Sequence, residues 1–175
     1  MQNYADHDGL GLAELVRKRE VTPAELLDAA VERIERHNGS LNAVTFKAYD
    51  EARAAAGGAL PDGPFKGVPF LIKDLGVRVK GWPRTSASRF AQVDADGEDS
   101  ELTKRYRASG VVLAGKTNTP ELTPEVITDN YVYGRTNNPY ALMHTPGGSS
   151  GGAAAIIAAG GVPFDIGTDT GGSIR

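Results

Sequence analysis

The stretch Val68-Pro69-Phe70-Leu71-Ile72-Lys73-Asp74 is a compact apolar run that ends in two charged residues. Such a run is typical of a buried β-strand whose last residues reach the edge of a sheet. Two more short apolar runs, Val111 to Ala114 and Val162 to Ile166, follow it along the chain. We therefore expect each of these runs to form a buried strand.

Helical patterns separate these runs. Ser100 to Ser109 is amphipathic, and Ala153 to Ala159 is rich in small apolar residues. Apolar strands that alternate with helices indicate an α/β fold in which helices flank a mixed, largely buried β-sheet. We expect residues 61–175 to form this α/β part, with the candidate catalytic residues in it.

Residues 1–60 are expected to form a mostly helical lead-in. Thr22-Pro23-Ala24-Glu25 combines an N-cap threonine, a proline at the first helical position and a capping-box glutamate. The apolar residues that follow recur at helical spacing, and Asn38-Gly39 is expected to end this helix. Leu41 to Tyr49 alternates enough to form a strand, and Glu51 to Ala56 resembles a short helix.

The composition is that of an ordinary globular protein. A length of 175 residues suits one domain, and a net charge of −3 without a basic patch argues against nucleic-acid binding. Cysteine is absent, which excludes disulfides, thiolate metal sites and a cysteine nucleophile. Met1 to Gly9 is polar and acidic, unlike a signal peptide, and the longest apolar stretch is too short to span a bilayer. We expect a cytoplasmic protein that contacts no membrane.

Two glycine–serine clusters lie near the end of the sequence, at Pro146 to Gly152 and at Gly167 to Ser173. Glycine allows close approach of the backbone to a ligand, so such loops can aim several N–H groups at one oxyanion. A helix that begins after Ser150 would add its positive end nearby. The alternative is a pair of tight turns without chemistry, but two clusters separated by one helix and one strand favour a site.

A serine nucleophile needs a group that accepts its proton. Of the histidines, His7 and His37 are expected at the surface, whereas His144 is close in sequence to the first cluster and stays a candidate. A buried lysine can serve instead, because desolvation lowers the pKa of an ammonium group. Lys73 is the best candidate, since it follows a buried strand; the alternative is that its side chain leaves the strand for solvent.

Two motif matches are rejected on physical grounds. Gly110 to Thr117 satisfies the phosphate-loop pattern, but its middle residues are apolar and would be the strand itself rather than a loop of exposed N–H groups. Gly148 to Gly152 satisfies the nucleophile-elbow pattern of α/β-hydrolases. That fold needs an acid and then a histidine later in the chain. No histidine follows Ser150 in this sequence, so the interpretation fails unless a C-terminal part supplies one.

Several segments together resemble the amidase signature family. Thr145 to Gly152, continued by Gly167 to Arg175, is similar to the family signature along its whole length. Gly67 to Asp74 resembles the catalytic-lysine segment of the family, and Gly115 to Glu121 resembles another recurrent segment. The helical start over Thr22 to Gly39 fits as well. The resemblance covers nearly the whole chain and implies the amidase signature fold.

The resemblance implies hydrolysis of a non-peptide carboxamide bond, in a linear or cyclic amide, through a seryl acyl-enzyme. Ser173 corresponds to the nucleophile, Ser149 to a bridging serine in a cis peptide bond, and Lys73 to the base. The resemblance also implies an oxyanion hole and three supporting residues, and it implies no metal or cofactor. The oxyanion hole would use the N–H groups of Thr170, Gly171, Gly172 and Ser173, and the supporting residues would be Ser150, Asp169 and Arg175.

Members of this family are several hundred residues long, so the resemblance implies that the chain is the N-terminal portion of a single amidase domain. The expected partners are a small-molecule amide substrate and either a second copy of the chain or the remaining C-terminal portion. The alternatives are an inactive fragment and the glutaminase subunit of a tRNA-dependent amidotransferase. Two segments depart from the family pattern, Leu122-Thr123-Pro124 and Ala87-Ser88, where glycine is expected.

Overall fold

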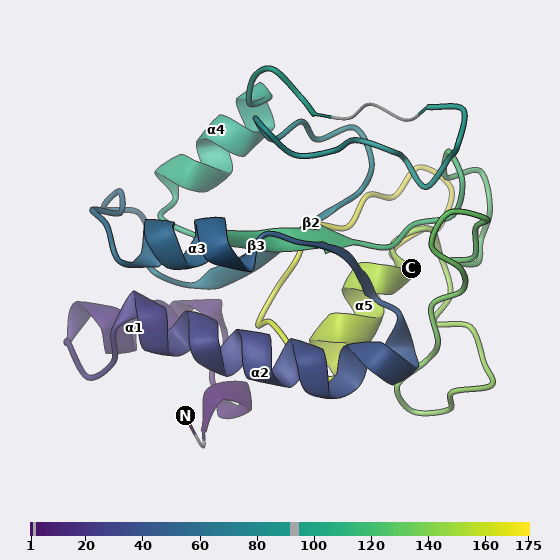
Figure 1. Cartoon of the computed structure of the whole chain (residues 1–175). Helices are drawn as coiled ribbons and strands as arrows, with labels where there is room; N and C mark the ends of the chain where they lie inside the picture. The colour runs from purple at the N-terminus through teal and green to yellow at the C-terminus, as the bar shows by residue number, and fades with distance from the viewer. Residues whose placement is uncertain (2, 92–94) are drawn as a thin grey trace.

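A computed structural model describes residue 1 and residues 3–91 and 95–175. Its elements alternate between helices and short strands along the chain (Figure 1). They are η1 (Tyr4–Asp6), α1 (Gly9–Arg17), α2 (Pro23–Leu41), β1 (Val44–Lys47), α3 (Tyr49–Ala56), β2 (Pro69–Lys73), α4 (Glu101–Ala108), β3 (Val112–Thr117) and α5 (Gly151–Ala158).

The strands form one mixed sheet in the order β1-β3-β2. β2 runs parallel to β3, and β1 runs antiparallel to it. Every residue of β2 and β3 is buried, as the apolar runs predicted. β3 includes the last residues of the rejected phosphate-loop match, Val112 to Thr117, so these residues form a strand rather than a phosphate-binding loop.

The prediction of a strand over Val162 to Ile166 is wrong in extent. A single parallel bridge joins Asp165 to Leu71 of β2, and no longer ladder forms among these described residues. Pro163 has no backbone N–H to donate, and Gly160 with Gly161 favours a turn just before it, so this segment cannot build a regular ladder. It nevertheless runs beside the edge of β2.

Helices flank the sheet on both sides. In Figure 1, α2 and α5 lie below the sheet and α4 lies above it. The face toward α2 and α5 packs through Leu27, Ile34, Leu71 and Ile156. The opposite face packs through Phe70, Ile72, Val79, Trp82 and Leu113. The fold is mixed α/β with flanking helices, as the sequence predicted, and α1 and α2 precede the first strand.

Helix α2 starts where the sequence predicted and ends later. The capping box is present, because the Thr22 hydroxyl accepts from the Glu25 N–H while the Glu25 carboxylate accepts from the Thr22 N–H. The expected end at Asn38-Gly39 is wrong, since the helix continues to Leu41. Asn42 provides the left-handed C-cap instead, and the Asn38 side chain accepts hydrogen bonds from the two N–H groups beyond it.

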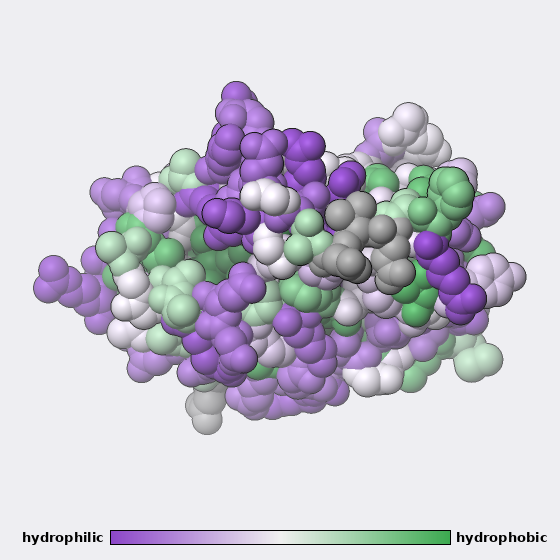
Figure 2. All heavy atoms as spheres, turned by 45° about the horizontal axis from the view of Figure 1, so that its top comes forward, coloured by the Kyte–Doolittle hydropathy of each residue, from purple (hydrophilic) through white to green (hydrophobic). Residues whose placement is uncertain are grey.

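The face in Figure 2 is largely hydrophilic, with several apolar patches between the polar side chains. Most of the large apolar side chains that are strongly exposed belong to the long connection between β3 and α5. These are Leu122, Val126, Ile127, Tyr131, Tyr140, Leu142 and Met143. Within the described part of the chain, none of the helices combines the length and the apolar character that a membrane crossing requires.

Candidate functional site

The candidate site lies where two parallel strands end and α5 begins. Lys73 is the last residue of β2, and Thr117, its partner in the strand register, is the last residue of β3. Both side chains are fully buried. Ser149 and Ser150 precede α5 directly, and the second glycine–serine cluster returns to the same place, so segments distant in sequence meet there.

A continuous chain of hydrogen bonds joins the three residues that the resemblance singled out. Lys73 Nζ donates to Ser149 Oγ over 2.7 Å. Ser149 Oγ donates to Ser173 Oγ, also over 2.7 Å. An amine and two hydroxyls at these distances can pass a proton from one end of the row to the other.

Lys73 is held among neutral hydroxyl groups. Besides Ser149, its ammonium donates to Ser150 Oγ at 3.0 Å and to Thr168 Oγ1 at 2.8 Å. The alternative that its side chain leaves the strand for solvent is therefore wrong. Burial lowers the pKa of Lys73 to about 8, although the charges of Asp165 and Asp169 oppose this shift. At that pKa about one tenth of the molecules would carry a neutral Lys73 at pH 7.

Ser149 is held through its backbone and through its neighbour. The Thr119 hydroxyl donates to the Ser149 carbonyl at 3.0 Å, and Thr128 Oγ1 donates to the Gly148 carbonyl at 2.9 Å. Gly148 has a positive φ of 61°, and a Cβ there would collide with the Ser173 carbonyl. Only glycine therefore allows the two clusters to approach so closely.

The cis peptide bond implied at Ser149 is not found. None of the described residues has a cis peptide bond, so this expectation is wrong. A trans bond is favoured by about 2.5–4 kcal/mol outside X–Pro sequences. In the structure the Ser149 hydroxyl reaches both Lys73 and Ser173 from a trans peptide.

Asp169 braces the turn that carries Ser173. Its carboxylate accepts from the Gly172 N–H at 2.7 Å and from the Ile174 N–H at 3.2 Å. It also pairs with the Arg175 guanidinium, at 2.9 and 3.0 Å. The Arg175 hydrogen bond and then the Gly172 N–H hold the pKa of Asp169 well below its usual range. Asp169 and Arg175, two of the three predicted supporting residues, therefore lie beside Ser173.

Ser150, the other predicted supporting residue, ties α5 to the second cluster. Its Oγ donates to the Thr168 carbonyl at 3.1 Å and accepts from the Thr168 N–H at 3.2 Å. Its own N–H donates to the Ser173 carbonyl at 3.4 Å. Ser150 therefore fixes the distance between the start of α5 and the Ser173 turn.

The backbone around Ser173 faces a cavity of about 380 Å³, which is large enough for a small ligand. Ser149, Ser173, Thr170 and Gly171 line one side of it. The Gly172 N–H is engaged by Asp169. Within the described chain, no hydrogen bond occupies the N–H groups of Thr170, Gly171 or Ser173.

Leu122 to Val126 also line this cavity. Leu122 and Thr123 both have positive φ values, 53° and 67°, in a segment that departs from the family pattern. The other departing segment lies beside it, because the Leu122 N–H donates to the Ser86 carbonyl and Ser88 Oγ donates to Glu121 at 2.7 Å. The two departures from the family pattern therefore form one region next to the site.

The structure also corrects the choice of candidates. His144 is exposed in a turn and takes no part in the contacts of Ser149 and Ser173. Thr168 and Asp165 also lie at the site, but the sequence patterns do not identify either of them as a candidate site residue. A charged residue inside the apolar run Val162 to Ile166 is the signal that could have identified Asp165. Across residues 1, 3–91 and 95–175, no three His, Cys, Asp or Glu side chains gather to hold a metal ion.

Comparisons with known proteins identify the family of the chain. Residues 25–175 match the family model described as Amidase. The chain is 41% identical over 171 residues to the 6-aminohexanoate-cyclic-dimer hydrolase of Paenarthrobacter ureafaciens, an alignment that covers 96% of this chain and 34% of the relative. It is also 41% identical over 172 residues to a glutamyl-tRNA(Gln) amidotransferase subunit of Corynebacterium jeikeium (strain K411), covering 94% of this chain and 34% of that protein.

A solved structure of 6-aminohexanoate cyclic dimer hydrolase superposes with a TM-score of 0.90 at 41% identity. That superposition covers 97% of this chain and 35% of the other. The chain thus spans about a third of the length of the relatives it matches.

Proposed function

Because the chain belongs to the amidase family, we propose that it supplies the nucleophile and the proton relay of an enzyme that hydrolyses carboxamide bonds. The observation that carries this proposal is the unbroken hydrogen-bond chain from Lys73 through Ser149 to Ser173. A buried lysine whose pKa is lowered to about 8 can act as a base near neutral pH.

In the first half of the reaction, neutral Lys73 accepts the proton of Ser149 while Ser149 accepts the proton of Ser173. The Ser173 oxygen forms a bond to the amide carbonyl carbon, and the carbonyl oxygen becomes an oxyanion. We propose that the N–H groups of Thr170, Gly171 and Ser173, residues that line the cavity, stabilise this charge. Gly172 can join them only if its N–H leaves Asp169.

The carbon–nitrogen bond then breaks. The proton held by Lys73 returns through Ser149 to the leaving nitrogen, so the amine departs neutral and Ser173 carries the acyl group. In the second half, water takes the place of the amine, and the same relay removes its proton. The acid is released, and Ser173 recovers its proton.

The site residues lie in one chain, but the relatives are about three times as long. We therefore place this chain as the N-terminal portion of a single amidase domain. Residues 1–60 would be a mostly helical lead-in that also supplies β1 of the sheet, and residues 61–175 the catalytic α/β part. The partner that completes the domain would be its C-terminal portion. We propose a small linear or cyclic amide as substrate, in the cytoplasm, without a nucleic-acid or membrane partner.

A serine-reactive fluorophosphonate probe tests the proposal on the chain itself. We expect labelling of the folded chain and complete loss of it in Ser173→Ala. Ser40→Ala is the matched control, because it removes an exposed hydroxyl whose one hydrogen bond within the described residues is to the His37 carbonyl of its own helix. Labelling that survives in Ser173→Ala, or a folded chain that takes up no probe, would contradict the proposal.

The base is tested in the same way. Lys73→Ala should reduce labelling about a hundredfold or more, the typical contribution of general base catalysis. Circular dichroism establishes whether the variant keeps its helices. Undiminished labelling of folded Lys73→Ala would contradict the assignment of Lys73 as the base.

A second function is supported by one observation. The relative that belongs to a tRNA-dependent amidotransferase is as similar to this chain as the cyclic-dimer hydrolase is, at 41% identity each. A glutaminase subunit would release ammonia from glutamine in preference to simple or cyclic amides. Comparing the release of ammonia from glutamine with hydrolysis of a cyclic amide, using the chain joined to its C-terminal portion, separates the two.

A further inference from the structure

Asp165 lies behind Lys73 on the same face of the sheet. Its single parallel bridge pairs it with Leu71, two residues before Lys73. Its neighbours Phe164 and Ile166 pack into the core on the opposite face, so the side chain between them points toward α5. Residues i and i+2 of a strand share a face, and Leu71 and Lys73 therefore do as well.

The carboxylate of Asp165 is only half satisfied. Its Oδ1 accepts from the Ile166 N–H at 2.6 Å. Its Oδ2 is buried and, within the described residues, has no hydrogen-bond partner. By hydrogen-bond geometry the same holds for Oγ1 of Thr117, the residue paired with Lys73 in the strand register, although this hydroxyl lies close enough to the Asp165 carboxylate to oppose the rise in its pKa. An unpaired buried carboxylate oxygen is costly, and its place next to a catalytic base calls for an explanation.

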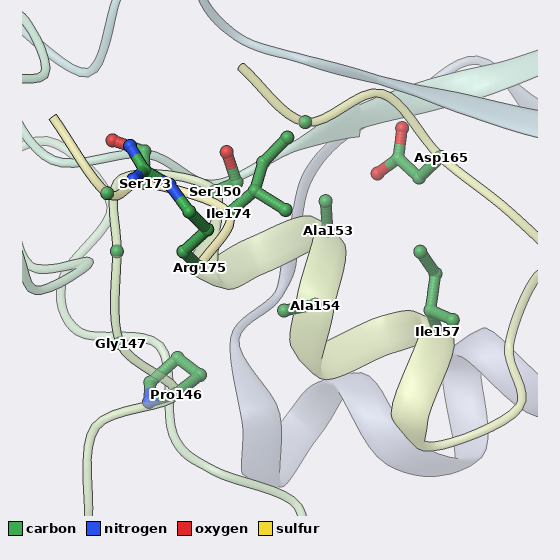
Figure 3. A pocket seen from close by; sticks show the side chains of 13 residues that line it. Pro146, Gly147, Ser150, Ala153, Ala154, Ile157, Asp165, Ser173, Ile174 and Arg175 are labelled. Atoms are coloured by element: carbon green, nitrogen blue, oxygen red, sulfur yellow. The ribbon is translucent and has the colours of Figure 1, made fainter. Parts of the chain in front are cut away.

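Asp165 also borders a second cavity, of about 310 Å³, between α5 and the Ser173 turn. Figure 3 shows it across this cavity from Ser150 and Ser173, with Ile157 of α5 below it. Asp165 and Ser173 therefore line the same cavity at different places, and within the described residues Asp165 makes no hydrogen bond to Ser149 or Ser173.

The charge balance of the proposed reaction indicates a role. When the relay runs, Lys73 becomes an ammonium ion in a buried place whose hydrogen-bond acceptors are neutral hydroxyls. The negative charges of two carboxylates, those of Asp165 and Asp169, act on the Lys73 ammonium and raise its pKa. Asp169 is already neutralised by Arg175. Asp165 has no ion-pair partner of its own within the described residues.

Resting on the proposed function, we propose that Asp165 is a positioning residue whose carboxylate stabilises the Lys73 ammonium that forms as Ser173 attacks. It acts through Lys73 and makes no bond to the reacting atoms.

The ionisation of the two groups supports this role. Burial raises the pKa of Asp165 to about 7, while the Ile166 N–H, the nearby Thr117 hydroxyl and the positive charge of Lys73 oppose that shift. The positive charge of Lys73 thus favours the ionised form of Asp165, and the negative charge of Asp165 favours the ionised form of Lys73. This is the relation expected of a coupled pair. Tyr106 of α4 is also affected by Asp165, because burial and then the negative charge of Asp165 raise the pKa of the Tyr106 hydroxyl. Next to the site, Asp74 and Lys116 form a buried ion pair at 3.2 Å, so each neutralises the charge of the other.

The test follows the titration of Lys73 in Asp165→Asn, which keeps the shape and removes the charge. Probe labelling of Ser173 is measured from pH 5.5 to 10. The midpoint should move to lower pH, and the plateau rate should fall about tenfold, equivalent to about 1.4 kcal/mol of lost transition-state stabilisation. Asp96→Asn is the matched control, because Asp96 also has a buried unpaired oxygen but pairs with Arg84. Its profile should match that of the unsubstituted chain.

A second measurement does not depend on turnover or on substitution of Asp165. Carbon-13 NMR of the aspartate carboxyl carbons in Lys73→Met should show the Asp165 titration moving to higher pH. An unchanged profile in Asp165→Asn, or an unchanged Asp165 titration in Lys73→Met, would overturn the inference while Ser173 labelling still upheld the proposed function. Absence of labelling in the unsubstituted chain would instead remove the proposed function, and this inference with it.

Discussion

Substitution of Gly152 by alanine should separate α5 from the end of the sheet. Gly152 lies in the first turn of α5, and a Cβ there would stand 2.6 Å from the Asn118 carbonyl oxygen and 2.8 Å from the Ala43 carbonyl oxygen. It would also collide with the Asn118 N–H. All three are backbone atoms that cannot rotate away. An ordinary contact needs at least 3.4 Å, so the helix must retreat by about 0.8 Å to clear the Asn118 carbonyl oxygen and farther to clear the Asn118 N–H.

The size of the effect follows from this displacement. Overpacking of a core costs about 1–3 kcal/mol, while alanine in place of a helical glycine returns about 0.5–1 kcal/mol. We expect a net loss of about 1–2 kcal/mol, or about 2–8 °C in melting temperature for a chain of this size. A shift of at least about 0.8 Å would also stretch the 2.7 Å contact between Lys73 and Ser149 to the limit of a hydrogen bond or past it. A misplacement of that order lowers a rate by up to about a hundredfold.

Urea unfolding and fluorophosphonate labelling measure the two effects separately. Gly39→Ala is the matched control, since Gly39 is also a helical glycine but has no atom within 4 Å of an added Cβ. It should stabilise the chain by about 0.5–1 kcal/mol and label at the original rate. If Gly152→Ala were as stable and as reactive as Gly39→Ala, the close approach of α5 to the strand end would not control the site.

Three further outcomes are expected. Labelling should rise with pH through about 8, because neutral Lys73 is the proton acceptor, and at pH 6 it should be about a hundredfold below its plateau; a flat rate from pH 6 to 9 would contradict this. Asp74→Ala leaves Lys116 as an unpaired buried charge, so urea unfolding should show a loss of about 3–5 kcal/mol. Adding Lys116→Met should recover most of that loss. Because the pKa of Asp165 is about 7 in the folded chain and near 3.8 in the unfolded chain, the folded state binds more protons between these values. The free energy of unfolding should therefore decline as pH rises from about 4 to about 7, and Asp165→Asn should abolish this component of the slope.

The features that the sequence predicted correctly depend on local chemistry. The start of α2 follows from Thr22 and Glu25, three residues apart, whose mutual hydrogen bonds require only one helical turn. Lys73 was assigned to a buried strand end because an apolar run leads directly into it, and its full burial agrees with that interpretation. In both cases the deciding neighbours are adjacent along the chain.

The features that were missed depend on contacts across the chain. The segment before Gly167 has the pattern of a strand, yet Pro163 allows only one bridge, at Asp165. Asn38 has the pattern of a helix end, but its side chain bonds to residues beyond the helix, and Asn42 takes the cap. The contact of Lys73 with Thr168 joins residues 95 positions apart, which no local pattern reports.

Regular structure holds only one member of the candidate triad. Lys73 ends a strand, whereas Ser149 follows a long connection without helix or strand. Irregular backbone must satisfy its polar groups in some other way, and here side-chain amides and hydroxyls do so. Asn118 is fully buried, and its Oδ1 accepts from Asn130 at 2.8 Å, while Asn130 also donates to the Thr119 carbonyl. Thr128 then bridges both sides of Ser149, since its hydroxyl donates to the Gly148 carbonyl and accepts from the N–H that opens α5. Ser149 is thus fixed from the end of β3 outward by amide and hydroxyl contacts, and its position depends on these side chains as much as on the sheet.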